Sequence, residues 1–341
     1  MNRKPKVFIS HWMPQIGVDL IERECQVDYY NGVVPLTKEA FIARAKEADA
    51  VLSFVCDYID EEIVRSCPGL QVLSSFGKGY DNIDVDACTK HNVLVTINAD
   101  ALTDSTADLA IGLLLAASRN LLPADRHVRA GRFRGWHATD FLGRDFHHSK
   151  LGIIGFGAIG QAIARRARGF DVDVIYYDIR RNRELESVMG VEFGELPDLL
   201  PQCDFLITAV DLHPGNRHLI GAVQLEMMKK DSYLINISRG SIVDERAVAE
   251  ALKHKRIAGY AADVFEFEDV IIEGRPDSIL QELLGEEERT VFTPHIGTGT
   301  IQARERLAIS SATQLLQALR GEIPAGAVNR VPVAPLLTHN R

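Results

Sequence analysis

The sequence of 341 residues contains only five cysteines, and no two of them are spaced as C-x-x-C. An odd number of cysteines without paired spacing argues against a disulfide framework and against a cysteine-based zinc site. We therefore predict a protein of a reducing compartment, the cytoplasm, with no structural metal.

Long apolar runs are also missing. No stretch approaches the roughly 18 apolar residues that a membrane-spanning helix needs, and the first ten residues read as a strand rather than as a signal peptide. The net charge of −9 disfavours general binding to nucleic acid. We expect neither a membrane nor a nucleic acid as a partner, and we find no internal repeat.

What the sequence does contain is an alternation of short apolar runs with helical patterns, which is typical of an open, mostly parallel α/β sheet. At this length two domains are expected. The predicted strands are Lys6–Ser10, Ala50–Phe54, Val72–Ser75, Val93–Ile97, a strand beginning at Lys150, Val172–Tyr177, Phe205–Val210, Tyr233–Ile237, Ala258–Ala262 and Thr290–Phe292.

Two long helical patterns frame the second series of strands, one over 104–119 and one over about 300–319. The stretch 127–136 between the first helix and the second series is basic and rich in glycine, and we interpret it as a loop or arm. The simplest arrangement has one domain inserted into the other. We predict an outer domain of residues 1–102 and 297–341 and an inserted domain of residues 103–296.

The most informative segment is Leu151–Gly160, an apolar strand that leads into G-x-G-x-x-G and then into a helix. Gly155 permits the tight turn, Gly157 permits close approach to a pyrophosphate, and Gly160 permits close helix–strand packing. The helix N-terminus, at Ala158 and Ile159, offers unpaired N–H groups to phosphates. This pattern predicts a dinucleotide site. The alternative is a glycine-rich turn without a ligand.

Asp178 ends the next predicted strand, where a carboxylate accepts hydrogen bonds from an adenosine ribose. The same carboxylate repels the 2′-phosphate of NADP, so we expect NAD as the cofactor. Three arginines follow closely and soften this preference, which leaves NADP as a weaker possibility: Arg180, Arg181 and Arg183.

Three further strand ends carry groups suited to chemistry beside a nicotinamide. Arg239 follows one strand, and its planar fork suits an oxyanion. An acidic segment, 263–269, follows the next strand, and His295 follows the last one. Histidine exchanges a proton near neutral pH, and a carboxylate on its other nitrogen fixes the tautomer. A surface arginine and a structural histidine are the alternatives.

The chain resembles the D-isomer-specific 2-hydroxyacid dehydrogenase family over essentially its whole length. The matching stretches are 77–84, 106–109, the nucleotide segment, Ser238–Gly240, 261–269 and Thr293–Gly297. The resemblance implies an NAD-binding Rossmann domain, a doubly wound parallel sheet, inserted into a flavodoxin-like α/β substrate domain. It also implies an NAD-dependent dehydrogenase and a homodimer, to which the 104–119 helix and the 127–136 arm would contribute.

The resemblance implies a role for each candidate residue. Arg239 would hold the substrate anion, His295 would be the acid/base, and Glu268 would be its partner, with Glu266 a bystander. Thr106, Ser238, Asp263 and Gly297 would lie at the cofactor together with the glycine turn and Asp178. Lys78, Gly79, Trp136 and Arg304 would contact the substrate. The alternatives are a solvated loop lysine at 78 and a packing role for Trp136.

Lys78 bears on the choice of substrate. A second cation beside Arg239, with Arg304 as a third, favours a small dianion such as phosphite over a 2-oxo acid. Within the family the resemblance is closest to the phosphite (phosphonate) dehydrogenases, through stretches that include 78–82 and 132–136. We therefore expect oxidation of phosphite to phosphate by transfer of hydride to NAD. The alternative is a 2-hydroxyacid dehydrogenase or reductase acting on glyoxylate, hydroxypyruvate or 2-ketogluconate, and a third hypothesis is an NADH-sensing co-regulator.

Overall fold

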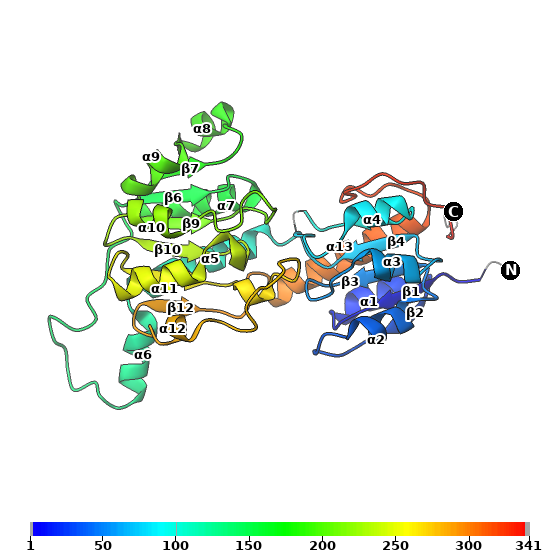
Figure 1. Ribbon diagram of the computed structural model, residues 1–341, viewed down its shortest axis with the longest axis horizontal. Coiled ribbons are helices and arrows are strands. Elements are labelled where there is room, and N and C mark those ends of the chain that lie inside the picture. Colours follow the sequence, from blue (N-terminus) through cyan, green and yellow to red (C-terminus); the bar gives the residue numbers. More distant parts are fainter. Residues whose placement is uncertain (1–2, 100, 338–341) are drawn as a thin grey trace. The chain divides into compact units, whose positions relative to one another are not determined.

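The computed structural model describes residues 3–99 and 101–337. The chain divides into two compact units, each with its own parallel sheet (Figure 1). The first unit is formed by residues 1–102 and 298–341, and the second by 103–297. The change of unit comes one residue later than the expected boundary at 296/297, because the N–H of Gly297 donates to Asp263 within the second unit at 2.7 Å.

The first unit is built on a five-stranded parallel sheet with the order β2-β1-β3-β4-β5. This is the flavodoxin-like order. Its strands are β1 (Lys6–Ile9), β2 (Gln26–Tyr29), β3 (Ala50–Ser53), β4 (Val72–Ser75) and β5 (Leu94–Thr96). All residues of β3 and β4 are buried, as expected for parallel strands covered on both faces.

Helices cover both faces of this sheet. They are α1 (Gln15–Glu22), α2 (Lys38–Ala45), α3 (Glu61–Ser66), α4 (Val85–Lys90) and α13 (Ile301–Leu319). The long helix α13, drawn in orange in Figure 1, packs on α1 and on the central strands. Buried side chains of α2, α3 and α4 form one core with Phe8, Val51 and Leu73. The chain end therefore returns to complete the unit that the N-terminal segment began.

The second unit contains a seven-stranded parallel sheet with the order β12-β11-β10-β9-β6-β7-β8. The chain starts at β6 in the middle, moves outward to β8 and then continues from β9 on the other side. This is the Rossmann order with one added strand. The strands are β6 (Lys150–Ile154), β7 (Asp173–Tyr177), β8 (Glu192–Phe193), β9 (Phe205–Thr208), β10 (Tyr233–Asn236), β11 (Gly259–Ala262) and β12 (Thr290–Phe292). The predicted fold class is confirmed.

Two helical layers cover the seven-stranded sheet. Helices α5 (Thr103–Ser118) and α7 (Ala158–Ala167) pack on each other and on one face. The other face carries α9 (Leu196–Leu199), α10 (Ala222–Met227), α11 (Glu245–Lys253) and α12 (Gln281–Leu284). Helix α8 (Arg183–Met189) precedes the edge strand β8. Short 3-10 turns complete the unit: η1 (Arg168–Phe170), η2 (Leu200–Gln202), η3 (Gly240–Ile242) and η4 (Glu266–Glu268).

The segment expected to be a loop or arm over 127–136 is partly helical, because α6 (Leu121–Arg129) includes its first three residues. Its polar side chains can pair at helical spacing, as Asp125 and Arg129 do one turn apart. No residue of α6 is buried. In Figure 1 the helix and the segment after it extend away from the sheet of this unit.

Within the described ranges, no single helix is long and apolar enough to cross a membrane. Helices α5 and α6 reach that length and apolar composition only together, and the chain bends by 65° between them. Most of α5 is buried in the core of the second unit. All five cysteines are free thiols, and all but Cys56 are buried.

Candidate functional site

The glycine turn between β6 and α7 has the geometry that its sequence predicts. Gly155 adopts a φ of +91°, and a Cβ there would lie 2.4 Å from the carbonyl oxygen of Ala209. A Cβ on Gly160 would lie 2.1 Å from the carbonyl oxygen of Gly155. Gly157 is exposed, with no atom within 4 Å of its Cβ position. The turn is therefore closely packed at Gly155 and Gly160 and open at Gly157, which suits a pyrophosphate at the N-terminus of α7.

Asp178 lies just after β7 and beside this turn. Its Oδ2 accepts a hydrogen bond from the N–H of Phe156 at 2.7 Å, and its Oδ1 accepts from the N–H of Arg180 at 3.2 Å. The carboxylate is thus fixed at the edge of the glycine turn, in the half-buried position that a ribose-binding acid requires.

The arginines after Asp178 are not equivalent. Arg181 forms two hydrogen bonds with Glu186, at 2.8 and 2.7 Å, and lies over the ring of Phe193 at 5.3 Å. A bidentate pair of this kind commits the guanidinium to its acid. Arg180 and Arg183 are exposed. The sequence gives no reason to distinguish the three arginines, whereas the structure pairs Arg181 with Glu186.

Arg239 follows β10 in a turn that Asn236 organises. The side-chain oxygen of Asn236 accepts from the Ser238 N–H at 3.0 Å, and its amide nitrogen donates to the carbonyl oxygen of Arg239 at 2.9 Å. Ser238 is buried, and its hydroxyl accepts from the N–H of Val210 at 3.0 Å. Sequence reasoning missed Asn236, although a buried asparagine at a strand end is a recognisable turn former.

Gly240 brings this turn against the acidic segment after β11. A Cβ on Gly240 would lie 1.8 Å from the carbonyl carbon of Phe265 and 2.1 Å from the nitrogen of Glu266. Only glycine fits such an approach. The turn that carries Arg239 and the η4 turn that carries Glu268 are therefore in direct backbone contact.

His295 and Glu268 form a close pair. Nδ1 of His295 lies 2.8 Å from Oε2 of Glu268, and both side chains are about one-third exposed, at 32% and 26%. Oε1 of Glu268 accepts from the N–H of Phe265 at 2.8 Å. With one oxygen anchored to the backbone, the carboxylate presents the other to the imidazole, which fixes the orientation of the ring.

The loop that carries His295 is held by Asp263. Its carboxylate accepts from the Thr293 hydroxyl at 2.6 Å and from the N–H groups of Ile296 and Gly297 at 2.8 and 2.7 Å. Burial raises the pKa of Asp263, and the Thr293 hydrogen bond opposes that rise. His295 itself has a φ of +53°, an uncommon conformation for histidine. We attribute its persistence to these three hydrogen bonds.

Thr106 on α5 approaches the same loop. Its Oγ1 would lie 3.3 Å from a Cβ on Gly297, and Asp263 would lie 3.2 Å from that position. Thr106, Asp263 and Gly297 therefore form one cluster next to the His295 turn. Because β10, β11 and β12 are parallel neighbours, the groups that follow them share the carboxyl edge of one sheet.

The remaining predicted residues lie elsewhere in the chain. Lys78 and Gly79 follow β4 in the first unit, and Arg304 lies in the first turn of α13 of that unit, where burial lowers the pKa of its guanidinium. Trp136 follows α6 and is 84% exposed. It lines a hollow of about 210 Å³ with Phe133, Phe141 and other residues of 124–141.

Comparison with known proteins gives a consistent result. Residues 111–297 match the model of the D-isomer specific 2-hydroxyacid dehydrogenase NAD binding domain. A glyoxylate reductase of Pyrococcus horikoshii is 41% identical over 331 residues, which covers 96% of both chains. The crystal structure of the TT0316 protein of Thermus thermophilus superposes with a TM-score of 0.86 at 31% identity, over 95% of this chain and 100% of that one.

A third relative is a D-lactate dehydrogenase of Aquifex aeolicus, solved with NAD and lactic acid. It has a TM-score of 0.83 and 26% identity, and covers 95% of this chain and 98% of its own. The expectation of a phosphite dehydrogenase finds no support among these relatives, whereas the alternative of a 2-oxoacid reductase does. The chain is an NAD-dependent oxidoreductase that belongs to the D-isomer specific 2-hydroxyacid dehydrogenase family.

Proposed function

We propose that this protein reduces a small 2-oxo acid of the glyoxylate class to the corresponding D-2-hydroxy acid. The observation that carries the proposal is the His295–Glu268 pair, 2.8 Å apart, on the same sheet edge as Arg239 and the dinucleotide turn. The 41% identical relative named glyoxylate reductase supports the same substrate class.

The chain's own groups suit a nicotinamide dinucleotide. The open position above Gly157 and the N–H groups of Ala158, Ile159 and Gly160 suit the pyrophosphate, and Asp178 suits the ribose hydroxyls. Thr106, Ser238, Asp263 and Gly297 are our candidates for the nicotinamide end. When bound, the reduced ring supplies the hydride that the reaction requires.

His295 supplies the proton. With Nδ1 held by Glu268, the imidazolium gives the proton on Nε2 to the carbonyl oxygen of the substrate as the carbon accepts hydride, and solvent later returns a proton to the ring. Arg239 holds the substrate carboxylate in a bidentate pair. One 2-oxo acid, one hydride and one proton give one 2-hydroxy acid. Lys78, Gly79, Trp136 and Arg304 stay predicted substrate contacts.

The phosphite hypothesis assumed that Lys78 and Arg304 join Arg239 around a dianion. The relatives named above favour a monoanionic 2-oxo acid instead. An assay distinguishes the two. We expect purified protein to consume NADH with glyoxylate, hydroxypyruvate or 2-ketogluconate and to form the D-isomer from hydroxypyruvate. Formation of NADH from NAD and phosphite, with no turnover of the 2-oxo acids, would reject the proposal, and absence of all turnover would favour the co-regulator.

We propose NAD as the preferred cofactor and Glu186 as part of the reason. Asp178 repels a 2′-phosphate, and Glu186 keeps Arg181 from pairing with one. We expect Asp178→Ala and Glu186→Gln each to raise the ratio of kcat/KM for NADPH over NADH by about 10-fold, which corresponds to about 1.4 kcal/mol. The first variant removes the charge that repels the 2′-phosphate, and the second releases Arg181 to pair with it. Glu184→Gln, an exposed acid on the same helix, is the matched control. An unchanged ratio in both variants would remove both acids from the selection.

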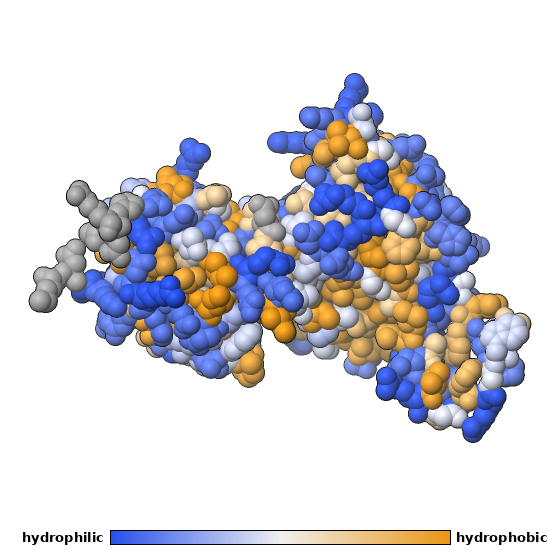
Figure 2. All heavy atoms as spheres, turned by 180° about the vertical axis from the view of Figure 1, so that it is seen from behind, coloured by the Kyte–Doolittle hydropathy of each residue, from blue (hydrophilic) through white to orange (hydrophobic). Residues whose placement is uncertain are grey.

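We propose a homodimer in which the arm contacts the second copy. Helix α6 has no buried residue, and the segment 121–142 exposes a set of large apolar side chains: Leu121, Val128, Phe133, Trp136 and Leu142. Figure 2 shows hydrophobic atoms on the lobe at its lower right. Light scattering should give about twice 37.8 kDa for the wild type and a lower mass for Val128→Asp with Phe133→Glu. A monomeric wild type at micromolar concentration would contradict this.

The free thiols support a cytoplasmic location, because unpaired cysteines are typical of a reducing compartment. Cell fractionation with an antibody to the chain tests this location, and recovery in an exported fraction would contradict it.

A further inference from the structure

The η4 turn that presents Glu268 is held by a second set of side chains, none of which belongs to the proposed proton-transfer pair. Glu245, the first residue of α11, is 1% exposed. Its Oε1 accepts from the N–H of Glu266 at 2.7 Å, and its own N–H donates to Oε1 of Glu266 at 3.0 Å. These reciprocal bonds tie the start of α11 to the start of η4.

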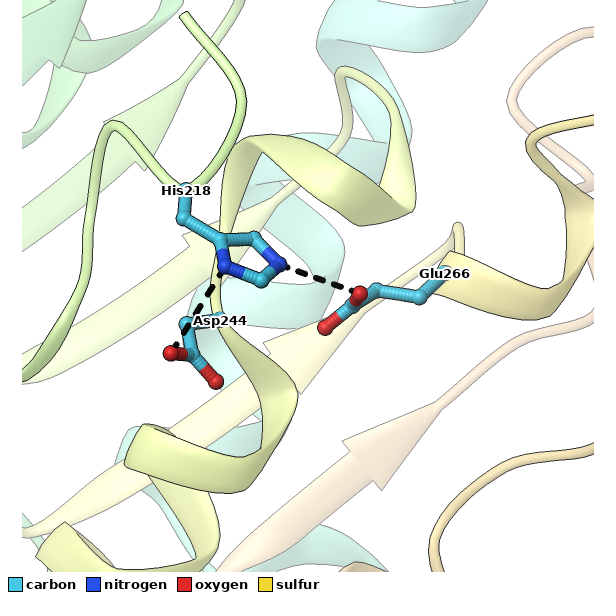
Figure 3. Close-up of side chains that lie close together, drawn as sticks. All are labelled: His218, Asp244 and Glu266. Carbon is cyan, nitrogen blue, oxygen red and sulfur yellow. Dashed lines mark hydrogen bonds and ion pairs between the residues drawn. The ribbon is translucent and has the colours of Figure 1, made fainter. Parts of the chain in front are cut away.

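His218 holds the other oxygen of Glu266. Its Nε2 lies 3.1 Å from Oε2 of Glu266, and its Nδ1 lies 3.7 Å from Oδ2 of Asp244 (Figure 3). The segment of His218 is itself anchored, because its N–H donates to the carbonyl oxygen of Ser241 at 2.7 Å and Ile220 pairs with Val243. Both oxygens of Glu266 are thus engaged, one by α11 and one by His218.

The side chains of His218, Asp244 and Glu266 have the composition of a metal site, with ligand atoms within 4.8 Å of one another. The arrangement argues against that use. Figure 3 shows the two carboxylates at different nitrogens of the ring, so an ion bound at one nitrogen would not replace the contact at the other. The second oxygens are also committed, that of Asp244 to the N–H of Ala247 and that of Glu266 to Glu245.

We propose that Glu245 and His218 are positioning residues for proton transfer, which clamp the η4 turn so that Glu268 holds His295 in place. This inference rests on the proposed function for its kinetic consequence, but the clamp itself is a statement about geometry. Glu268 is two residues from Glu266 in the same 3-10 turn, and Asp269 closes the turn by accepting from the Ser241 N–H at 2.6 Å. A turn released at Glu266 would move Glu268 relative to the imidazole.

The electrostatics of the clamp favour protonation of Glu245 below about pH 7. Its pKa is raised from 4.5 to about 7, chiefly by burial and also by the carboxylates of Glu266, Asp269 and Glu268, while the hydrogen bond from the Glu266 N–H opposes the rise. Its Oε2 is buried and has no hydrogen-bond partner among the described residues. Burial also raises the pKa of the nearby Tyr260 hydroxyl. A neutral acid keeps its carbonyl oxygen for the Glu266 N–H without adding a fourth negative charge.

The test compares three variants. Glu245→Gln keeps an acceptor oxygen for the Glu266 N–H, Glu245→Ala removes it, and Glu250→Ala is the matched control, an exposed glutamate on the same helix. We expect Glu245→Ala to lower kcat by about 10-fold, because a displacement of about 1 Å can cost 10²-fold. We expect Glu245→Gln to stay within about 2-fold, and the dissociation constant for NADH to be unchanged in all three.

A second measurement separates positioning from general destabilisation and from failure of the proposed function. Nitrogen-15 NMR of labelled histidine follows the hydrogen bond at Nδ1 of His295 directly, with His295→Asn to assign the signal. In Glu245→Ala and in His218→Gln the Nδ1 signal should move, because a displaced Glu268 no longer holds that nitrogen at 2.8 Å. This result would stand even if no 2-oxo acid were turned over.

Two results would overturn the inference. The first is an unchanged His295 Nδ1 signal and pH–rate profile in both Glu245→Ala and His218→Gln, provided that both variants are folded by circular dichroism. The second is a loss of activity on treatment with EDTA that zinc restores, which would assign the cluster to a metal ion instead of to hydrogen bonds.

Discussion

The second unit holds two histidine–carboxylate pairs whose acids are only two residues apart on η4. His295 lies 2.8 Å from Glu268, and His218 lies 3.1 Å from Glu266. Both histidines adopt a left-handed backbone, with φ of +53° and +52°. Among the described residues, His295 has a carboxylate at one ring nitrogen only, whereas His218 has one at each.

This difference shows that residue type alone does not decide which histidine is suited to proton transfer. His218 has its Nε2 within hydrogen-bond distance of Glu266 and its Nδ1 facing Asp244 at 3.7 Å, so both nitrogens lie beside acids of the chain and not beside an open position for a substrate. A histidine held at one nitrogen has its tautomer fixed and keeps the other nitrogen for reaction. The contrast supports the proposed proton transfer by His295 and a structural role for His218, and the following variants test it.

The largest effect is expected from the histidines themselves. His295→Asn should lower kcat/KM for glyoxylate by about 10²- to 10⁴-fold, the usual contribution of a general acid. His218→Asn should cost less than about 10-fold, because it acts only through η4. Steady-state assays with NADH check both, and fluorescence quenching by NADH should be alike in the two variants. A greater loss at position 218 would reverse the assignment.

Substitution of Glu268 should likewise cost more activity than substitution of Glu266. Glu268→Gln should lower kcat by about 10- to 100-fold, since a hydrogen bond to a charged group contributes about 1.5–3 kcal/mol. Its pH–rate profile should also differ from that of Glu266→Gln, because Glu268 contacts the reacting imidazole directly. Glu266→Gln keeps an acceptor for the Glu245 N–H and should cost only a few-fold. Identical pH–rate profiles for the two variants would contradict the contrast.

Glu245 should make stability depend on pH. Its pKa is raised from 4.5 to about 7, so between these values the folded chain holds a proton that the unfolded chain has lost. The free energy of unfolding should therefore fall by up to about 3 kcal/mol as the pH rises from about 4.5 to about 7 and should level off above that.

The measurement is urea unfolding of the wild type and of Glu245→Gln at several pH values. Burial raises the pKa of Asp57 in the first unit from 3.8 to about 6 and adds a slope of the same sign, so only the difference between the two proteins reports on Glu245. A difference that does not vary with pH would show that Glu245 is ionised throughout.

The smallest effect is expected at Asp244. Asp244→Asn keeps the side-chain oxygen that caps α11 through the Ala247 N–H but removes the charge 3.7 Å from His218. The pair is about one-third exposed, so its loss should cost less than about 1 kcal/mol of stability and leave kcat within about 2-fold. A large loss of activity would mean that the ionic contact, and not the bond to Glu266, holds His218.

Much of the second unit can be predicted from the sequence, because the motifs that indicate its strands and turns consist of residues close together in the chain. A glycine turn after an apolar strand and polar residues just past parallel strands can be located from neighbours in the chain, and the family resemblance assigned roles to Arg239, Glu268 and His295, which stay predictions. The clamp was missed because its contacts are not local. Glu245 reads as an ordinary first-turn acid, and its partner Glu266 is 21 residues away. The family resemblance implies only a bystander role for Glu266.

The sequence by itself determined the α/β class and the dinucleotide turn, because strand periodicity and glycine spacing suffice for these, and one acid after a strand was enough to predict NAD. Only the tertiary structure decided which arginine is committed to Glu186, which histidine keeps a nitrogen for reaction, and that Glu245 is buried among other acids. Those properties depend on distances between side chains of separate elements and on the exclusion of water. Neither can be deduced from the residues of one segment of the chain.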